Sequence, residues 1–323
     1  MAMPTSNTGL QEHLLDLAWS LWTELGVSGW ERRHTSHAID PEPLIIFTAW
    51  LGDTDPRLRD ESIDWCIRYG RHVSGARLRN LLSDEREGRR SSFGWYAATV
   101  AANSPFRWPF ATEPRRYEPT GKSHLEDLAR PSLISLRMRS IFGVTARADI
   151  LRVMLGTPGT ASTAADLAPD VGYTKRNVAE ALEALRIAGI LDVTPWRNQL
   201  KYRLAKVDAL VSLVGEVPAI FPRWRSVFRV AMRSLETTQM IEDLPANVRF
   251  VEADKALREM EGDLQDADLP GPSPSDQPRE KIFSSWANDL VRSLAFPEPT
   301  SWPTRRLGMP GAKKALAGER GAP

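Results

Sequence analysis

The sequence predicts a mainly α-helical protein with one small β-hairpin near its middle. Two Asp-Pro pairs, at residues 40–41 and 55–56, have the form of helix starts, with a capping carboxylate before proline at the first helical position. Polar and apolar side chains alternate as in a strand over residues 200–204, and no such alternation is found in the N-terminal part. A third observation is a leucine stripe at helical spacing: Leu10, Leu14, Leu17, Leu21 and Leu25.

Residues 1–102 are predicted to form a helical domain that serves for dimerisation or for binding a partner protein. The expected helices cover residues 41–51, 56–69, a stretch capped by Ser74, and 92–102. An alternative is that the helices between residues 41 and 86 form a second three-helix DNA-binding unit, in which Arg77 and Arg79 would be exposed.

The regions on either side of the middle differ in charge. Residues 103–142 are predicted to be an irregular basic connection, because prolines and one glycine collect there and eight basic residues stand against four acidic ones between Arg107 and Arg147. Residues 208–265 are predicted to be helical. Residues 266–323 are predicted to comprise a linker, a short helix at 279–295 and a disordered, proline-rich tail, and acidic residues predominate from 242 to 280.

Residues 143–207 carry the most informative pattern. A helix is expected over 146–155, and a short second helix after Thr163. Thr174 caps a third helix, which Gly189 ends and in which Val178, Leu182 and Leu185 must face inward. An apolar strand at 190–193, a polar turn at 195–199 and the alternating strand at 200–204 then form a hairpin. Three helices followed by a hairpin, in this order, predict a winged helix-turn-helix.

This segment resembles the large superfamily of winged-helix bacterial regulators, of the MarR and ArsR kinds, over about a fifth of the chain. The resemblance implies a DNA-binding fold, although winged helices also serve as protein-binding and structural modules. The matching stretches are Ala-Asp-Leu-Ala at 165–168, Gly-Tyr-Thr-Lys-Arg-Asn-Val at 172–178, Ala-Leu-Glu-Ala-Leu at 181–185 and Ala-Gly-Ile-Leu at 188–191.

The candidate DNA-binding residues lie at the start of the third helix and in the wing. A helix fits the major groove, where arginine can pair with guanine and asparagine with adenine. Arg176 and Asn177 are therefore candidates for reading bases, and Lys175 for contacting phosphate. The complete set of candidates is Thr174, Lys175, Arg176, Asn177, Arg197, Asn198, Gln199 and Lys201. The simpler alternative is that these residues form only the solvated face of a packed helix.

No catalytic motif is found, so the chain is not expected to be an enzyme, and neither a cofactor nor a metal site is predicted. His34 and His37 are expected on a surface loop. Trp196 is expected to brace the hairpin rather than to contact nucleic acid. The longest apolar run, near Leu44 to Leu51, is far below the ~20 residues that cross a bilayer, so a cytoplasmic protein without membrane contact is expected.

The formal net charge of +1 provides no global electrostatic case for nucleic-acid binding, so the functional prediction depends on the local pattern. The predicted function is sequence-specific binding of double-stranded DNA by a homodimeric transcriptional regulator that acts as a repressor. The alternative is an antitoxin or adaptor subunit of a defence or toxin system, which would bind a protein partner through its helical domain and its winged helix.

Overall fold

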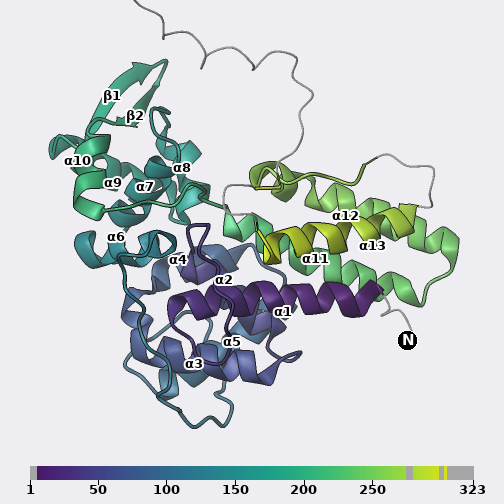
Figure 1. Cartoon of the computed structure of the whole chain (residues 1–323). Coiled ribbons are helices and arrows are strands. Elements are labelled where there is room, and N and C mark those ends of the chain that lie inside the picture. Colours follow the sequence, from purple (N-terminus) through teal and green to yellow (C-terminus); the bar gives the residue numbers. More distant parts are fainter. Residues whose placement is uncertain (1–5, 274–278, 298–301, 304–323) are drawn as a thin grey trace, which may run out of the picture.

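The structure is a computed structural model that describes residues 6–273, 279–297 and 302–303. Within these residues the chain is mainly helical, and its only sheet has two antiparallel strands (Figure 1). The N-terminal elements are α1 (Ser6–Leu25), α2 (Pro41–Leu51), α3 (Pro56–Tyr69), η1 (Gly70–His72), α4 (Gly75–Ser83) and α5 (Glu87–Ala102). The central elements are η2 (Pro131–Leu133), α6 (Ile134–Phe142), α7 (Ala146–Gly156), α8 (Ala164–Val171), α9 (Lys175–Ile187), β1 (Leu191–Trp196), β2 (Gln199–Leu204) and α10 (Val207–Val214). The C-terminal helices are α11 (Trp224–Glu242), α12 (Ala246–Asp266) and α13 (Arg279–Ala295).

These elements form two hydrophobic cores. The first core joins α1–α5 with α11–α13, and we call this unit the helical body. The second core joins α6–α10 with the two strands, and we call this unit, residues 134–214, the hairpin module. Helix α1 lies along α13, and α11 packs on α12, so N-terminal and C-terminal helices close the helical body together (Figure 1).

The predicted starts of α2 and α3 are both confirmed, but their two capping residues behave differently. Asp55 is a cap in the expected sense, because its carboxylate accepts from the backbone N–H groups of Arg57 and Leu58 at 2.9 and 3.1 Å. The expected capping bond of Asp40 is absent, because this carboxylate is ion-paired with Arg77. Sequence alone could not distinguish a cap from an ion pair formed with a distant helix.

The connection between the two cores is only partly irregular. Residues 103–130 run without helix or strand along the helical body, where the Asp64 carboxylate accepts from the backbone N–H groups of Gly121 and Ser123 at 2.7 and 3.0 Å. The prediction of an irregular connection up to residue 142 is wrong for its last part, which forms η2 and α6. Ile134 and Met138 form an apolar face that packs into the second core.

The C-terminal part also departs from the prediction. Residues 267–273 were expected to be a solvated linker, but Ala267 and Leu269 are buried in the first core, and the Trp286 indole donates to the Pro270 carbonyl at 2.8 Å. The predicted helix at 279–295 is confirmed as α13. Most of the predicted tail, residues 298–301 and 304–323, lies outside the described residues.

Candidate nucleic-acid interface

The first turn of α9 lies at the surface, as its candidate role requires. Thr174 Oγ1 accepts from the backbone N–H of Asn177 at 3.3 Å, which is the predicted N-cap. Val178, Leu182 and Leu185 are buried in the second core, so the opposite side of the helix faces solvent. The four candidates on this turn, Thr174, Lys175, Arg176 and Asn177, are all exposed.

The charges on this turn are only partly neutralised. Arg176 Nε lies 2.9 Å from Glu180 Oε1, one helical turn along α9, and both side chains are exposed. Lys175 makes no ion pair with any described residue. An exposed pair between residues i and i+4 is weak and is screened by salt, so Arg176 can exchange Glu180 for another anion at little cost.

The two strands form a hairpin whose outer half leaves the core. Trp196 pairs with Gln199, so the connecting turn consists of Arg197 and Asn198 alone. At the base of the hairpin Tyr202 and Leu204 are buried, but Leu200, expected on the same inner face, is 45% exposed. The hairpin therefore projects away from the rest of the molecule (Figure 1).

The hairpin turn has an unusual backbone. Arg197 has φ +54°, and it is the first of the two turn residues. Positive φ at this position alone is the pattern of a type II′ turn, in which glycine is the residue that fits without strain. An arginine is thus held in a left-handed conformation at the tip of the hairpin.

Trp196 lies outside the second core and contacts the opposite strand of the hairpin. Its side chain is 53% exposed, and the Lys201 ammonium lies 4.5 Å from the centre of its ring. This contact is a cation–π interaction on the outer part of the hairpin. Trp196 therefore contacts the facing strand through Lys201 and not through apolar packing in the second core.

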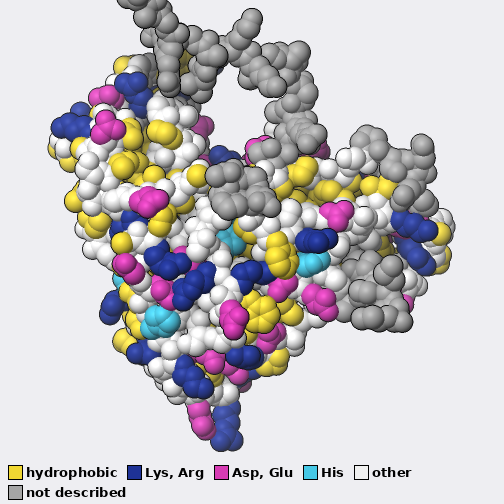
Figure 2. Space-filling model, viewed as in Figure 1, with side chains coloured by type: hydrophobic (Ala, Val, Ile, Leu, Met, Phe, Trp, Pro, Cys, Tyr) yellow, Lys and Arg dark blue, Asp and Glu magenta, His cyan; other side chains and the backbone are white. Residues whose placement is uncertain are grey.

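Acidic side chains near this surface reduce its charge. Arg203 pairs with Asp192 at 3.2 Å, and Arg186 with Glu183 at 2.6 Å. Among the described residues of α9 and the hairpin, the cations without an ion pair are Lys175, Arg197 and Lys201. Figure 2 shows basic side chains at the free end of the hairpin, with acidic ones close by. The surface has a modest local excess of positive charge rather than a broad basic patch.

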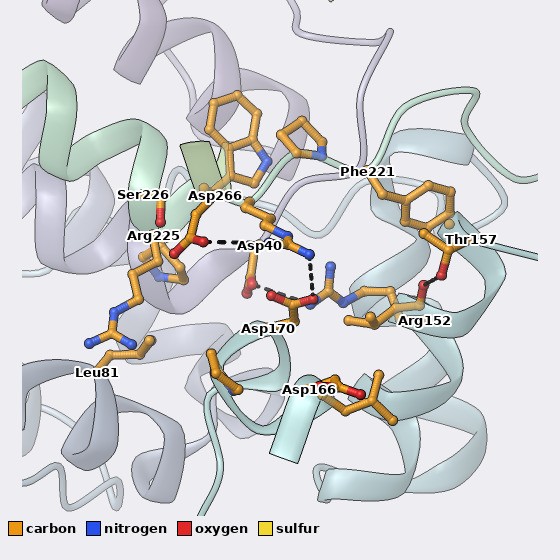
Figure 3. Close-up of a pocket in the computed structure, with 18 of the residues that line it drawn as sticks. Asp40, Leu81, Arg152, Thr157, Asp166, Asp170, Phe221, Arg225, Ser226 and Asp266 are labelled. Carbon is orange, nitrogen blue, oxygen red and sulfur yellow. Dashed lines mark hydrogen bonds and ion pairs between the residues drawn. The ribbon is translucent and has the colours of Figure 1, made fainter. Parts of the chain in front are cut away.

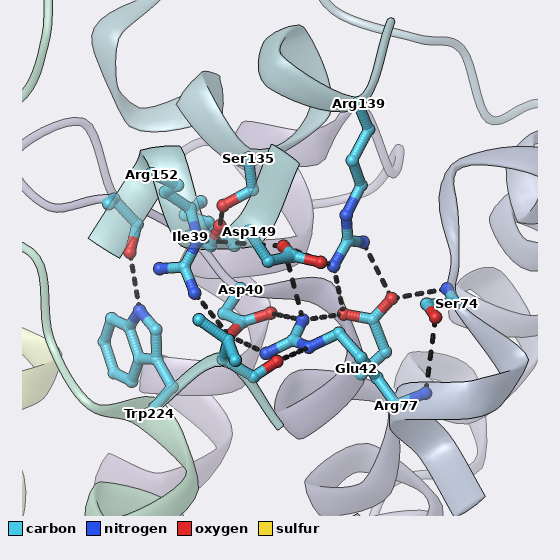
Figure 4. A network of polar contacts seen from close by, with 12 residues as sticks. Ile39, Asp40, Glu42, Ser74, Arg77, Ser135, Arg139, Asp149, Arg152 and Trp224 are labelled. Carbon is cyan, nitrogen blue, oxygen red and sulfur yellow. Dashed lines mark hydrogen bonds and ion pairs between the residues drawn. The ribbon is translucent and has the colours of Figure 1, made fainter. Parts of the chain in front are cut away.

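A buried network of three arginines and three carboxylates joins the hairpin module to the helical body (Figure 4). Arg77 Nη1 and Nη2 donate to the two oxygens of Asp40 at 2.6 and 2.7 Å. Arg139 donates to Glu42 at 2.7 and 2.9 Å and to Asp149 at 2.9 Å. The complete network consists of Asp40, Glu42, Arg77, Arg139, Asp149 and Arg152.

The network favours the charged forms of Asp40, Arg77 and Arg139 despite burial. Burial alone would raise the pKa of Asp40, but Arg77 and Arg152 outweigh burial and hold this pKa well below its usual range. Sequence analysis missed this network. The helical stretches that hold Arg139 and Asp149 also contain Arg137, Arg147 and Arg152, so their pattern gave no signal that some of these charges are buried.

The network also excludes the second DNA-binding unit considered at residues 41–86. Arg79 is exposed, but Arg77 is only 1% exposed, and its Nε donates to the Val171 carbonyl at 2.7 Å. The start of α4 is covered by the hairpin module, where the Ser74 and Tyr173 hydroxyls lie 3.0 Å apart. Helix α4 therefore cannot present its first turn to a groove.

The histidines expected on a surface loop are in fact buried. His34 Nε2 lies 2.8 Å from His37 Nδ1, and the His34 ring meets Trp224 edge to face. Among the described residues, no three His, Cys, Asp or Glu side chains are grouped so that they could hold a metal ion. In the same part of the chain, no helix has both the length and the apolar character to cross a membrane.

Comparison with known protein families, with curated proteins and with solved structures produced no significant match for this chain. The functional assignment therefore depends on the geometry of the exposed helix and hairpin.

Proposed function

We propose that the hairpin module is a winged helix-turn-helix that binds double-stranded DNA, with α9 as recognition helix and the hairpin as wing. One observation carries the proposal: the first turn of α9 and the hairpin turn are both exposed, and both carry cations that have no ion pair with a described residue. The positive end of the α9 dipole adds to the attraction for phosphate.

The candidate residues divide into two roles. Arg176 and Asn177 have the chemistry to pair with guanine and adenine edges, and they lie where a helix entering the major groove would place them. Lys175, Arg197 and Lys201 supply positive charge for the phosphate backbone. Asn198 and Gln199 lie beside Arg197 and provide hydrogen-bonding groups at the wing tip.

We further propose that the protein is a transcriptional repressor that binds DNA as a homodimer. Two copies would place two recognition helices in successive major grooves, about one helical turn apart. Selection of bound fragments from a pool of random DNA tests this directly. A symmetric motif with half-sites at that spacing is the expected result, and failure to enrich any sequence would contradict specific binding.

Variants separate base reading from backbone binding. Arg176→Ala should weaken binding and relax the sequence preference at one position, at a cost of about 1–3 kcal/mol. Lys201→Ala should weaken binding to all sequences and reduce the salt dependence by about one counterion. Arg79→Ala is a matched control on the exposed side of α4 and should bind as the natural protein does. Equal effects of all three substitutions would contradict the proposed roles.

A second candidate function is that of an antitoxin or adaptor subunit that binds a protein. The observation in its favour is that α11 and α12 expose large apolar side chains near their connecting turn: Met240, Val248, Phe250 and Val251. Co-purification of a defined partner together with no shift of any DNA fragment would favour this candidate over the first.

A further inference from the structure

A cleft of about 280 Å3 separates the hairpin module from the helical body (Figure 3). Helices α7 and α8 form one wall, and the opposite wall comes from α2, α4, α11 and α12. The volume lies just below the ~300–1,000 Å3 of typical ligand pockets, so the cleft suits a small molecule. Leu81, Phe221 and Trp224 provide apolar surface, and the lining also contains five arginines and five aspartates.

Arg152 lacks part of its expected bonding in this cleft. The side chain is only 4% exposed, and its Nη2 lies 3.4 Å from an Asp40 oxygen that Arg77 already occupies. Its Nε has no hydrogen-bond partner, since the nearest carboxylate oxygen, on Asp149, is 3.9 Å away. A buried guanidinium whose carboxylate partners are at 3.4 and 3.9 Å is incompletely compensated, and an anionic oxygen entering the cleft would meet its terminal nitrogens.

Two aspartates that line the same cleft, Asp170 and Asp263, lack full compensation by positive charge. Asp170 is held by Arg223 at 2.9 Å, and Asp263 lies 3.6 Å from Arg229. Burial nevertheless raises the pKa of both carboxyl groups above the usual range, so their compensation by cations is incomplete. A cationic group in the cleft would stabilise their ionised form.

We propose that the cleft binds a small zwitterion with an apolar side group, an apolar α-amino acid in its simplest form. Its carboxylate would meet Arg152, its ammonium would face Asp170, and its side group would lie against Phe221 and Trp224. The lining pairs arginines with aspartates in equal number, so it has no excess of one sign that would favour a simple anion or a simple cation. The site does not depend on the nucleic-acid function proposed above.

Calorimetric titration of the full chain tests the site with L-phenylalanine and with two compounds that each lack one of its charges. 3-Phenylpropanoate lacks the ammonium, and 2-phenylethylamine lacks the carboxylate. L-Phenylalanine is expected to bind saturably with one site per chain, and each of the other compounds roughly tenfold more weakly. The proposal is overturned if millimolar L-phenylalanine, L-leucine and L-isoleucine all fail to bind, or if one of the two singly charged compounds binds as tightly as L-phenylalanine.

Two variants locate the bound molecule. Arg152→Gln should abolish binding, but Arg152 also belongs to the buried network, so thermal denaturation must show that this variant folds. Asp170→Asn lies outside that network and should weaken L-phenylalanine roughly tenfold while leaving 3-phenylpropanoate unchanged. Arg147→Gln, on the exposed side of the same helix as Arg152, is the matched control and should bind normally. Unchanged binding of L-phenylalanine by Asp170→Asn would overturn the assignment.

Discussion

Arg197 has an unfavourable backbone conformation and an exposed positive charge. For a residue other than glycine, the left-handed conformation costs roughly 1–2 kcal/mol, and nothing in the second core requires a long side chain at the tip of a projecting turn. The strain is consistent with a role for the guanidinium outside the protein, which the proposed wing contact supplies.

Substitution of this residue should separate stability from binding. Arg197→Gly is expected to raise the free energy of unfolding by about 0.5–1 kcal/mol, because glycine adopts positive φ without strain. The same change should weaken DNA binding and flatten its salt dependence. Urea denaturation and a binding titration at several salt concentrations measure the two effects. Arg197→Lys keeps both the charge and the strain, so it should change neither quantity much; a stable Arg197→Gly with natural DNA affinity would show that the charge is not used.

The burial of His34 and His72 should make stability depend on pH. Burial first, and then the neighbouring His37 and Arg32, lowers the pKa of His34 to about 3, from 6.5 in an unfolded chain. Below about pH 6.5 the unfolded chain therefore binds a proton that the folded protein does not, and stability falls by up to about 1.4 kcal/mol per pH unit toward pH 3. His72, with a pKa lowered to about 4, acts in the same direction.

Urea denaturation near pH 7 and near pH 5 measures this effect. His34→Gln should remove about half of the stability loss between the two pH values, since two histidines contribute to it. His124→Gln is the control, because His124 is exposed beside Glu126. An unchanged pH dependence in His34→Gln would mean that His34 is protonated in the folded state.

At the scale of elements, the buried network fixes how the hairpin module sits on the helical body. It draws on α4, α6 and α7 and on the N-terminal end of α2, and its three positive and three negative charges balance. Removing one partner from such a network lowers the free energy of unfolding by more than the net contribution of the network to stability, because the remaining charges stay buried.

Arg77→Met is therefore expected to lower the free energy of unfolding by about 3–5 kcal/mol, since Asp40 and Glu42 each lose a partner. Arg79→Met, two residues away on the exposed side of α4, should change it by less than about 0.5 kcal/mol. Urea denaturation of both variants is the measurement. Comparable losses in the two would mean that the network contributes no more than an average surface position.

At the scale of the whole molecule, α13 should be indispensable to the helical body. A chain that ends at residue 273 loses Phe283, Leu290, Val291 and Leu294 from the first core. Each such side chain contributes about 1.5–3 kcal/mol by burial, so the sum approaches the ~5–15 kcal/mol by which a domain is stable. Circular dichroism should show no cooperative thermal unfolding of the truncated chain, whereas Lys281→Ala, at an exposed position of α13, should unfold like the natural protein. Cooperative melting of the truncated chain near the natural temperature would contradict this role.

What could be predicted from the sequence was local. The caps at Asp55 and Thr174 and the spacing of Val178, Leu182 and Leu185 are contained within a few residues, so α3, α9 and the exposed first turn of α9 were all predicted correctly. The hairpin was also predicted, because strand alternation is equally local, but the turn expected over 195–199 is only Arg197 and Asn198, since β1 extends to Trp196.

What could not be predicted depends on distant partners. Arg77 and Asp40 are 37 positions apart, and Arg139 and Glu42 are 97 apart, so no periodicity connects them. The same holds for the packing of α1 on α13 and for the burial of His34 against Trp224. From sequence alone, a charged residue in a helix is predicted to face solvent, because the distant residue of opposite charge that is buried with it is not known.

The core that α1–α5 share with α13 has a consequence for synthesis. Helices α1–α5 leave the ribosome first, but their apolar surfaces are completed only when α13 has emerged, roughly 190 residues later. At a synthesis rate of about 5–20 residues per second, α13 emerges on the order of 10–40 s after α1–α5. The hairpin module, whose core is continuous in sequence apart from Ala38, can meanwhile fold within the growing chain.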